Sequence, residues 1–232
     1  MPPLSGPFLD CLTLKIEAFC SSEMSLIIYQ LMQYTIPEDL NSPFFHELKP
    51  YQIYDVLYFV YRKAEEGFQF CASSLQRNIE AGQNDQDTLM LWALTMDWYA
   101  RFLVEVNRLP EAFECFKKAY DLCVQIKGVD NEEIVAVLND LGTICFVQND
   151  IDNALSYLTQ AVAIGNKLPD MEDFGSVLIN LGTVYMKKGM VQEATQVYQE
   201  AWRNAKKHKN SEVLKQANSC LDELKSSQTA QT

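Results

Sequence analysis

Two pairs of adjacent carboxylates, Glu65-Glu66 and Glu132-Glu133, are the candidates for acid–base chemistry in this 232-residue chain. Two carboxyl groups held at different pKa values can divide the roles of acid and base. Both pairs, however, fall near expected helix N-termini, where negative side chains offset the helix dipole. No phosphate-binding glycine loop, nucleophile elbow or H-E-x-x-H motif occurs in the sequence. We therefore predict no catalytic residue, no cofactor and no small-molecule substrate.

The cysteines and histidines are the candidate metal ligands. The cysteine number is odd, no C-x-x-C occurs, and His46 and His208 lie far apart. Most cysteines fall in apolar runs typical of helices, which predicts reduced thiols in the core of an intracellular protein and no metal site. The seven cysteines are Cys11, Cys20, Cys71, Cys115, Cys123, Cys145 and Cys220.

Charge and hydropathy exclude two other classes of partner. The net charge of −12 argues against nucleic acid, since phosphate binding needs clustered cations. One basic cluster, within residues 203–209, is interpreted as the last turn of a helix, with a binding patch as the alternative. An aromatic run at 51–61 favours a core or contact surface over base stacking or membrane contact, because it lacks interleaved cations. No run of 18 apolar residues occurs, so we predict no membrane span.

The elements that would position any site come from an internal repeat. Three segments align on the small residues Ala100, Gly142 and Gly182, with periods of 42 and 40 residues. Each segment carries an alanine twelve residues later, a large apolar residue four further on, and another alanine three beyond that. A small residue in one helix lets a second helix approach closely, and the two alanines share one face of that second helix. The matched sets are Ala112, Phe116 and Ala119; Ala154, Leu158 and Ala161; and Ala194, Tyr198 and Ala201.

This spacing of small and large residues resembles the tetratricopeptide repeat, a helix hairpin of two antiparallel helices. The sequence thus predicts an all-α solenoid of tetratricopeptide-type helix hairpins with a C-terminal capping helix. We expect a non-repeat segment at 1–62, one half repeat plus three repeats at 63–209, and the capping helix with a polar tail at 210–232. The half repeat would have a first helix over about 45–59 and a second containing Ala64, Phe68 and Cys71.

Helix limits follow from capping and helix-breaking residues. Asp130, with Glu133 three residues on, predicts a capping box for a helix that ends near Gln148. Glycine at 189 should separate the two helices of the last repeat. Three further residues are expected to begin the helices that follow: Asp150, Asp170 and Ser211.

A more specific resemblance covers residues 63–226. Segments such as GFQFCASSLQRNIEAG (67–82) and WYARFLVEVNRLPEAFECFKKAYDLCVQIKG (98–128), followed by residues 137–209, resemble the C-terminal part of the tetratricopeptide repeat protein 19 family. Members of that family are mitochondrial inner-membrane proteins that bind respiratory complex III, the cytochrome bc1 complex. The resemblance therefore implies a role in the assembly and maintenance of complex III.

The front of the chain departs from that family. The family carries an import presequence, a membrane-spanning helix and further repeats before this region. Residues 1–61 instead hold seven acidic side chains against two lysines, the wrong sign for import. We expect no readable import signal or anchor in the chain as it stands, and an aberrant or alternative start is an open interpretation of residues 1–62.

A partner-binding groove is the remaining candidate site. In tetratricopeptide repeats the first helix of each hairpin lines a concave groove, so residues around the aligned small residues should face a bound protein segment. An ordinary solvated helix face is the alternative for any single one of them. The predicted groove residues are Asp97, Arg101 and Val104 in the first repeat; Asn139, Asp140, Thr143 and Phe146 in the second; and Ile179, Asn180, Thr183 and Met186 in the third.

The sequence alone thus predicts a protein-binding scaffold without enzymatic activity. By resemblance its partners are complex III subunits and its location is the mitochondrial inner membrane. The alternative is a cytosolic adaptor that binds cargo or client peptides in a groove like that of kinesin light chains, whose repeats are also longer than 34 residues.

Overall fold

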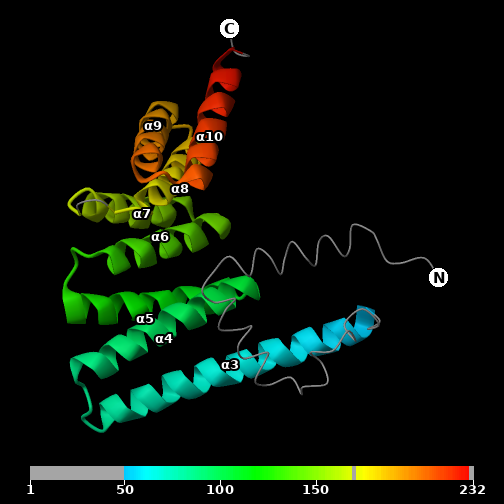
Figure 1. Cartoon of the computed structure of the whole chain (residues 1–232), viewed down its shortest axis with the longest axis vertical. Helices are drawn as coiled ribbons and strands as arrows, with labels where there is room; N and C mark the ends of the chain where they lie inside the picture. Colours follow the sequence, from blue (N-terminus) through cyan, green and yellow to red (C-terminus); the bar gives the residue numbers. More distant parts are fainter. Residues whose placement is uncertain (1–49, 169–170, 230–232) are drawn as a thin grey trace. The chain divides into compact units, whose positions relative to one another are not determined.

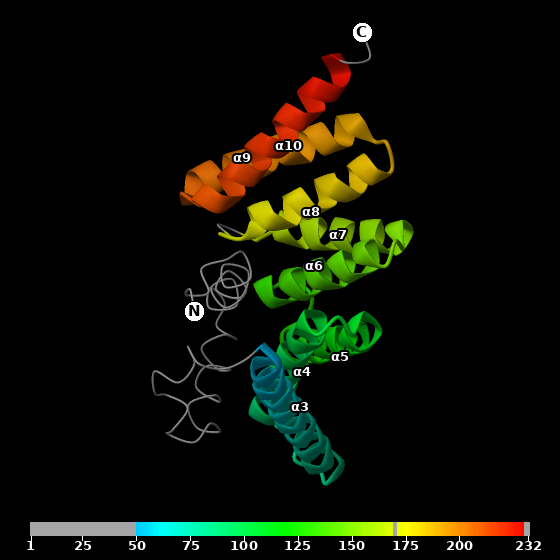
Figure 2. The same ribbon diagram turned by 90° about the vertical axis from the view of Figure 1, so that its right-hand side faces the viewer.

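The computed structural model describes residues 50–168 and 171–229, and every regular element within these ranges is an α-helix. The predicted all-α class is confirmed. Figures 1 and 2 show the helices from two directions. They are α3 (Pro50–Glu80), α4 (Gln86–Glu105), α5 (Leu109–Lys127), α6 (Glu132–Val147), α7 (Ile151–Gly165), α8 (Phe174–Lys187), α9 (Val191–His208) and α10 (Ser211–Thr229).

The chain divides into two compact units, Met1–Ser74 and Leu75–Thr232. Helix α3 runs through this division as one continuous helix of 31 residues. The expectation of separate helices before and after residue 60 was therefore wrong. Pro50 is the first helical residue, a position where proline's missing N–H costs nothing and its fixed φ suits the helix. Residues 45–49, where the expected first helix began, lie outside the described residues.

The second unit is built from three helix hairpins. Helices α4 and α5, α6 and α7, and α8 and α9 pack as antiparallel pairs, and each pair contacts the next through α5–α6 and α7–α8. Helix α8 also contacts α6, so the first helices of the second and third hairpins meet directly. This is the predicted tetratricopeptide-type solenoid, with one hairpin for each aligned segment.

Close approach within each hairpin explains the small residues of the repeat. Ala100 is fully buried, and a Cβ on Gly142 would lie 2.6 Å from Leu158 Cγ and 3.3 Å from the Ala154 carbonyl oxygen. A Cβ on Gly182 would overlap the ring of Tyr198. The second helix of each hairpin therefore rests directly on the backbone of the first.

The turns inside the three hairpins share one backbone conformation. Asn107, Asn149 and Gly189 occupy equivalent positions with φ of 60°, 62° and 74°. In each turn the next residue donates its N–H to a carbonyl five residues back, as in the 2.8 Å bond from Asp150 N to Cys145 O. Glycine and asparagine are the residues that tolerate this left-handed conformation best, so the expected break at 189 is confirmed and recurs in all three repeats.

Helix N-termini match the expected caps in part. The Asp150 carboxylate accepts from Asn153 N, as predicted. Asp130 does not cap α6: the extended Asn131 does, accepting from Ile134 N at 3.0 Å, while Asp130 pairs with Lys167. The helix therefore begins one residue later than predicted. The backbone of Asn131 is extended, and this places its side chain where it can accept from the free N–H of Ile134, as an N-cap residue does.

The start of the following helix also differs from its prediction. Asp170 lies outside the described residues, and α8 begins at Phe174 after Asp173. Helix α10 begins at Ser211 as expected, and the Asn210 side chain accepts from Val213 N at 3.1 Å.

Helix α10 closes the C-terminal end of the stack. It packs on α9 and α8 through an apolar stripe in which Val213, Ala217 and Leu224 are buried. Its remaining surface is polar and exposed, as expected of the terminal element of a repeat stack. The predicted capping helix is confirmed, and it continues to Thr229, into the segment expected to be a polar tail.

Candidate functional site

The predicted groove residues lie on one face of the three first helices α4, α6 and α8, which we call the A-face. Counted from Ala100, Gly142 or Gly182, they occupy positions −3, +1 and +4 of each repeat, together with position −2 of the second and third repeats. Most are partly buried, and Val104 and Thr143 are exposed. Ile179 is the exception, since only 8% of it is exposed and it belongs to the hydrophobic core.

A partly buried charge network joins the first two repeats across this face. The Arg101 guanidinium donates from Nε to Asp97 Oδ2 at 3.0 Å and lies 2.8 Å, Nη2 to Oδ2, from Asp140 on α6. About a fifth of each carboxylate side chain is exposed. The two carboxylates hold the pKa of Arg101 above its ordinary value even though burial lowers it. The arginine therefore stays charged and bridges α4 to α6.

Asp140 is the electrostatically perturbed member of this network. The pKa of Asp140 is raised to about 6: burial is the largest cause, the Arg101 guanidinium opposes it, and the neighbouring Asp97 carboxylate adds to it. Its Oδ2 atom is inaccessible to solvent and accepts no well-aligned hydrogen bond. The short approach of Arg101 to this atom is thus an ion-pair contact rather than an aligned bond.

Amides replace charges at the junction of the second and third repeats. Asn180 Nδ2 on α8 donates to Asn139 Oδ1 on α6 at 2.8 Å and reaches Thr143 Oγ1 at 3.5 Å. Asn180 and Asp140 both occupy position −2, and each contacts the preceding repeat at position +1. The two junctions therefore use equivalent positions with different chemistry.

The threonines and the apolar residues of the A-face complete it. Thr143 and Thr183 bond to carbonyls of their own helices, Asn139 O and Ile179 O, at 2.8 and 3.0 Å. Position +4 is apolar in every repeat: Val104 is 37% exposed, and Phe146 and Met186 are partly buried. The A-face thus carries a polar row at −3 to +1 and an apolar row at +4, a combination suited to a segment with both kinds of side chain.

Sequence reasoning selected these residues but missed that they bond to one another. A signal was present, because Arg101 and Asp140 are opposite charges at positions +1 and −2 of adjacent repeats. Which positions meet depends on the angle between hairpins, which the sequence pattern does not give.

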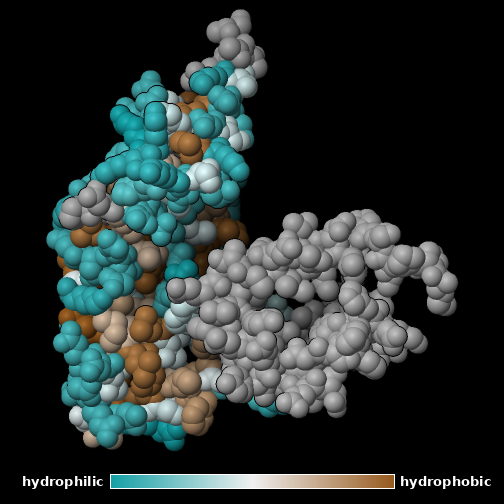
Figure 3. Space-filling model, in the orientation of Figure 1, coloured by the Kyte–Doolittle hydropathy of each residue, from teal (hydrophilic) through white to brown (hydrophobic). Residues whose placement is uncertain are grey.

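The remaining surface shows where other groups gather. On the face in Figure 3, hydrophobic residues lie over α4 and α5, and hydrophilic ones predominate over α9. The exposed Leu91 and Leu94 belong to α4. A cavity of about 290 Å³ lies where the end of α7 and the start of α8 face α9, and Arg203 and Lys207 of the basic cluster line it with His208. Lys206, Lys207 and His208 form the last turn of α9, as predicted.

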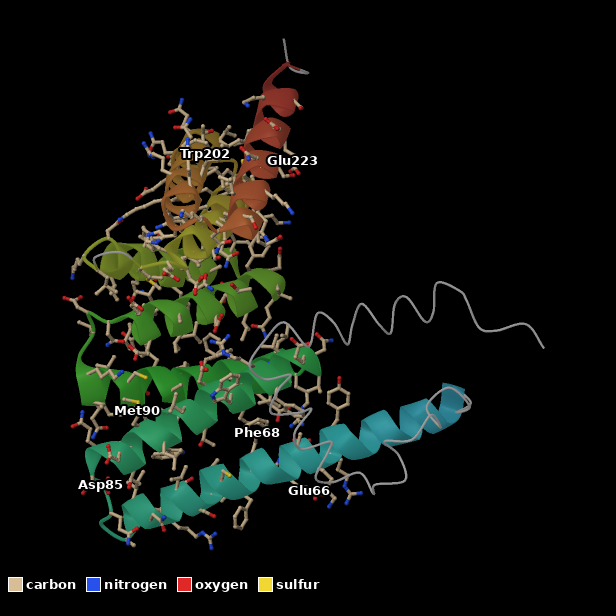
Figure 4. The ribbon with its side chains drawn as sticks, viewed as in Figure 1. Glu66, Phe68, Asp85, Met90, Trp202 and Glu223 are labelled. Carbon is tan, nitrogen blue, oxygen red and sulfur yellow. The ribbon has the colours of Figure 1, made fainter. Side chains whose placement is uncertain are left out.

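The carboxylate pairs and thiols behave as structural groups. Glu132 and Glu133 fall in the first turn of α6, as expected. Glu66 does not lie at a helix N-terminus: Figure 4 shows it midway along α3, where it pairs with Arg62 and Lys63.

Cys11 and Cys20 lie outside the described residues, and the other five cysteines follow the expectation of core positions except at one. Cys115, Cys123 and Cys145 are buried and Cys220 is partly buried, whereas Cys71 is exposed. Within residues 50–168 and 171–229, no group of three potential ligands could hold a metal ion. Over the same residues, no helix combines the length and apolar character needed to span a membrane.

Comparisons with known proteins agree with this architecture. Tetratricopeptide repeat models match residues 89–167, the first two hairpins, and 175–208, the third. The crystal structure of BtubC (BKLC) from P. vanneervenii covers 95% of this chain and 92% of its own at a TM-score of 0.51 and 18% identity, a likeness of fold alone.

Two curated relatives match the repeat region in sequence. The mitochondrial tetratricopeptide repeat protein 19 homolog of Drosophila melanogaster is 29% identical over 70% of this chain and 44% of its own length. Mitochondrial tetratricopeptide repeat protein 19 of Homo sapiens is 26% identical over 69% of this chain and 45% of its own length. The predicted family resemblance is confirmed, and the matched part of the chain spans less than half the length of these relatives.

Proposed function

We propose that this tetratricopeptide-repeat protein, whose repeats resemble those of the mitochondrial tetratricopeptide repeat protein 19 relatives, is a non-catalytic scaffold that binds a protein through its A-face. Both helices of each hairpin contribute to the hydrophobic core. The A-face lies at the edge of that core, and most of its side chains keep a part of their surface accessible to a partner.

The observation that carries this proposal is the apolar row. Val104, Phe146 and Met186 recur at position +4 of three repeats and remain partly or largely accessible. Positions −1, +12 and +16 supply buried core residues, and Phe146 and Met186 pack against the edge of the core while part of each stays accessible. A partner segment that covers the row would bury apolar area worth about 25 cal/mol per Å².

A more specific proposal concerns the location of the protein in the cell and the identity of the protein that it binds. The relatives are named mitochondrial. By this resemblance we propose that the protein acts at the mitochondrial inner membrane, that its partners are subunits of respiratory complex III, and that it supports their assembly and maintenance.

The test truncates two of the three residues of the apolar row and leaves the polar side chains that join the repeats unchanged. The double variant Phe146→Ala and Met186→Ala should lose most of the co-purification with complex III subunits from mitochondrial extract. The control Leu91→Ala and Val129→Ala removes exposed apolar side chains elsewhere and should co-purify as the unaltered chain does. Circular dichroism should show the same helicity in all three proteins.

Two results would contradict parts of the proposal. Unchanged capture by the first variant would mean that the partner binds another face. Capture of no complex III subunit by the unaltered chain would refute the more specific proposal and leave a scaffold for other proteins.

A further inference from the structure

Helix α4 carries an exposed apolar stripe formed by Leu91, Leu94 and Trp98. The three residues are spaced three and four apart, so their side chains lie on one side of the helix. Leu91 is 54% and Leu94 46% exposed, and Trp98 is partly buried. The positions of the two leucines, −9 and −6, hold acidic or small residues in the other repeats, so the stripe belongs to the first repeat. Those residues are Glu133 and Ala136 in the second repeat, and Asp173 and Ser176 in the third.

The stripe lies on the side of α4 where a preceding repeat would stack. Trp98 occupies position −2 of the first repeat. In the other repeats the residue at −2 reaches the first helix of the repeat before it. Asp140 lies 2.8 Å from Arg101, and Asn180 donates to Asn139 at 2.8 Å. The corresponding side of α4 is thus suited to meet another first helix, through apolar side chains in place of polar ones.

The first helix that should precede α4 in the sequence is absent from residues 50–80. Ala64, Phe68 and Cys71 of α3 repeat the spacing that marks the second helix of each hairpin. The residues before them belong to the same continuous helix, which begins at Pro50. Helix α3 therefore has the sequence of a second helix without a separate first helix in the part of the chain that the structure describes.

We propose that the stripe of Leu91, Leu94 and Trp98 binds an amphipathic helix of a protein partner. The helix takes the role of a first helix before α4, and the contact continues the junctions that already join the first helices of the stack. Apolar residues spaced i, i+3 and i+7 on the incoming helix cover the stripe. The stripe differs from the apolar row of the A-face, so the inference goes beyond the proposed function.

Charge at the two ends of the stripe selects the partner. Asp87 lies four residues before Leu91, and Glu105 lies seven after Trp98, so both acids fall on the side of the stripe, and both are exposed. A helix with lysine or arginine at its ends complements them.

The same charges disfavour two other occupants. A second copy of α4 packed antiparallel would bring Asp87 of one copy towards Glu105 of the other, which are like charges. Residues 1–49 of this chain carry six acids against two lysines. A basic helix from a different protein therefore fits the stripe best.

The test measures fluorescence anisotropy of three labelled, alanine-rich peptides of about 18 residues, long enough to form a helix. The first has leucines at i, i+3 and i+7 and lysines at both ends. The second has the same composition with the leucines on different sides, and the third has glutamates in place of the lysines. At about 150 mM salt, which limits long-range attraction, the full chain should bind the first peptide more tightly than the other two. Equal binding of all three peptides would overturn the proposal.

Truncation of the stripe should weaken this binding. Leu91→Ala with Leu94→Ala should raise the Kd for the first peptide about tenfold, the order expected for losing the accessible apolar area of two leucines. Val129→Ala with Val147→Ala removes exposed apolar side chains elsewhere and should leave the Kd unchanged. An equal loss in both double variants, or no loss in the first, would overturn the proposal.

Two further variants keep the proposal testable if the leucine variant does not fold. Leu91→Lys places a like charge at an exposed position and should weaken binding of the lysine peptide. Asp87→Asn with Glu105→Gln should remove the preference for lysine ends over glutamate ends. An unchanged Kd in the first of these, or an unchanged preference in the second, would refute the inference.

Other occupants of the stripe give different results. A dimer in light scattering that dissociates with Leu91→Ala and Leu94→Ala would mean that a second copy covers the stripe. A monomer that binds none of the peptides would mean that the chain covers it itself. Phe146→Ala with Met186→Ala should leave peptide binding intact, and its loss there would place the peptide on the A-face. Each of these three results would overturn the proposal, whereas capture of complex III subunits tests only the proposed function.

Discussion

A single methyl group at Gly182 should destabilise the third repeat. A Cβ there would lie 2.7 Å from Cδ1 and 2.8 Å from Cζ of Tyr198, closer than carbon atoms pack. The tyrosine ring is only 3% exposed, and its hydroxyl lies 3.4 Å from Thr183 Oγ1, so it has little room to move aside. Either α8 and α9 separate or the ring leaves its rotamer.

The size of the effect follows from two opposing contributions. Overpacking in a tight core costs about 1–3 kcal/mol. Replacing glycine by alanine within a helix returns about 1 kcal/mol. Because the added Cβ overlaps a buried ring, the cost should lie in the upper part of that range, so we expect Gly182→Ala to lower the free energy of unfolding by about 1–2 kcal/mol and the Tm by several degrees. Urea unfolding followed by circular dichroism at 222 nm would measure it.

Gly67→Ala is the matched control for this prediction. Gly67 also lies inside a helix, α3, but an added Cβ there meets no atom within 4 Å. Its replacement should leave stability unchanged or raise it slightly through helix propensity alone. A wild-type unfolding curve for Gly182→Ala would refute the close contact between α8 and α9 and, with it, the repeat register.

Three further changes test other features. The pKa of Asp140 is about 6 in the folded chain against an ordinary 3.8, so the folded state binds the proton more tightly. The free energy of unfolding should therefore rise by up to about 2.4 kcal/mol as pH falls from 7 to 4, relative to Asp140→Asn measured over the same range. Asn149→Val should lower it by about 1 kcal/mol because valine tolerates φ of 62° poorly, whereas Asn149→Gly should not, as thermal melts would show. Asn210→Ala removes the acceptor for Val213 N and should cost about 1 kcal/mol, seen first as faster amide exchange in the first turn of α10.

The repeats were predictable because their signal is steric and local. Ala112, Ala154 and Ala194 are fully buried, and the small residues opposite them could not be larger. A spacing that recurs three times leaves few alternatives to a stack of hairpins. The break at Gly189 followed for a similar reason, since glycine favours a left-handed turn, whereas the equivalent turns at Asn107 and Asn149 were not predicted.

Two local predictions were wrong, namely the N-cap of α6 and the start of α3. Asp130 and Asn131 can both cap a helix, and the choice depends on which of them is extended at the chain reversal. Pro50 can end one helix or begin another, and the sequence before it does not decide between these outcomes. In each case the deciding quantity is a backbone angle rather than a residue type.

The contacts among the predicted groove residues could not be predicted from the sequence. Arg101, Asn139 and Asn180 were expected to face a partner, yet each of them bonds to another A-face residue. The hydrogen bonds they make depend on how far one hairpin is rotated against the next. Triple replacement of these residues by alanine would therefore disturb the stack as well as any binding.

The two junctions have a consequence for how such a protein could be lengthened or shortened. Asp140 requires a cation in the repeat before it, so the second repeat can follow only a repeat like the first. Asn180 can donate to a carbonyl or a carboxylate, so the third repeat would fit behind either of the others. Duplication of the second repeat would place Asp140 against Thr143 with no counter-charge. Duplication of the third would place Asn180 against Ile179, which offers no side-chain acceptor, and leave it only Thr183. The order of the three repeats is thus directional.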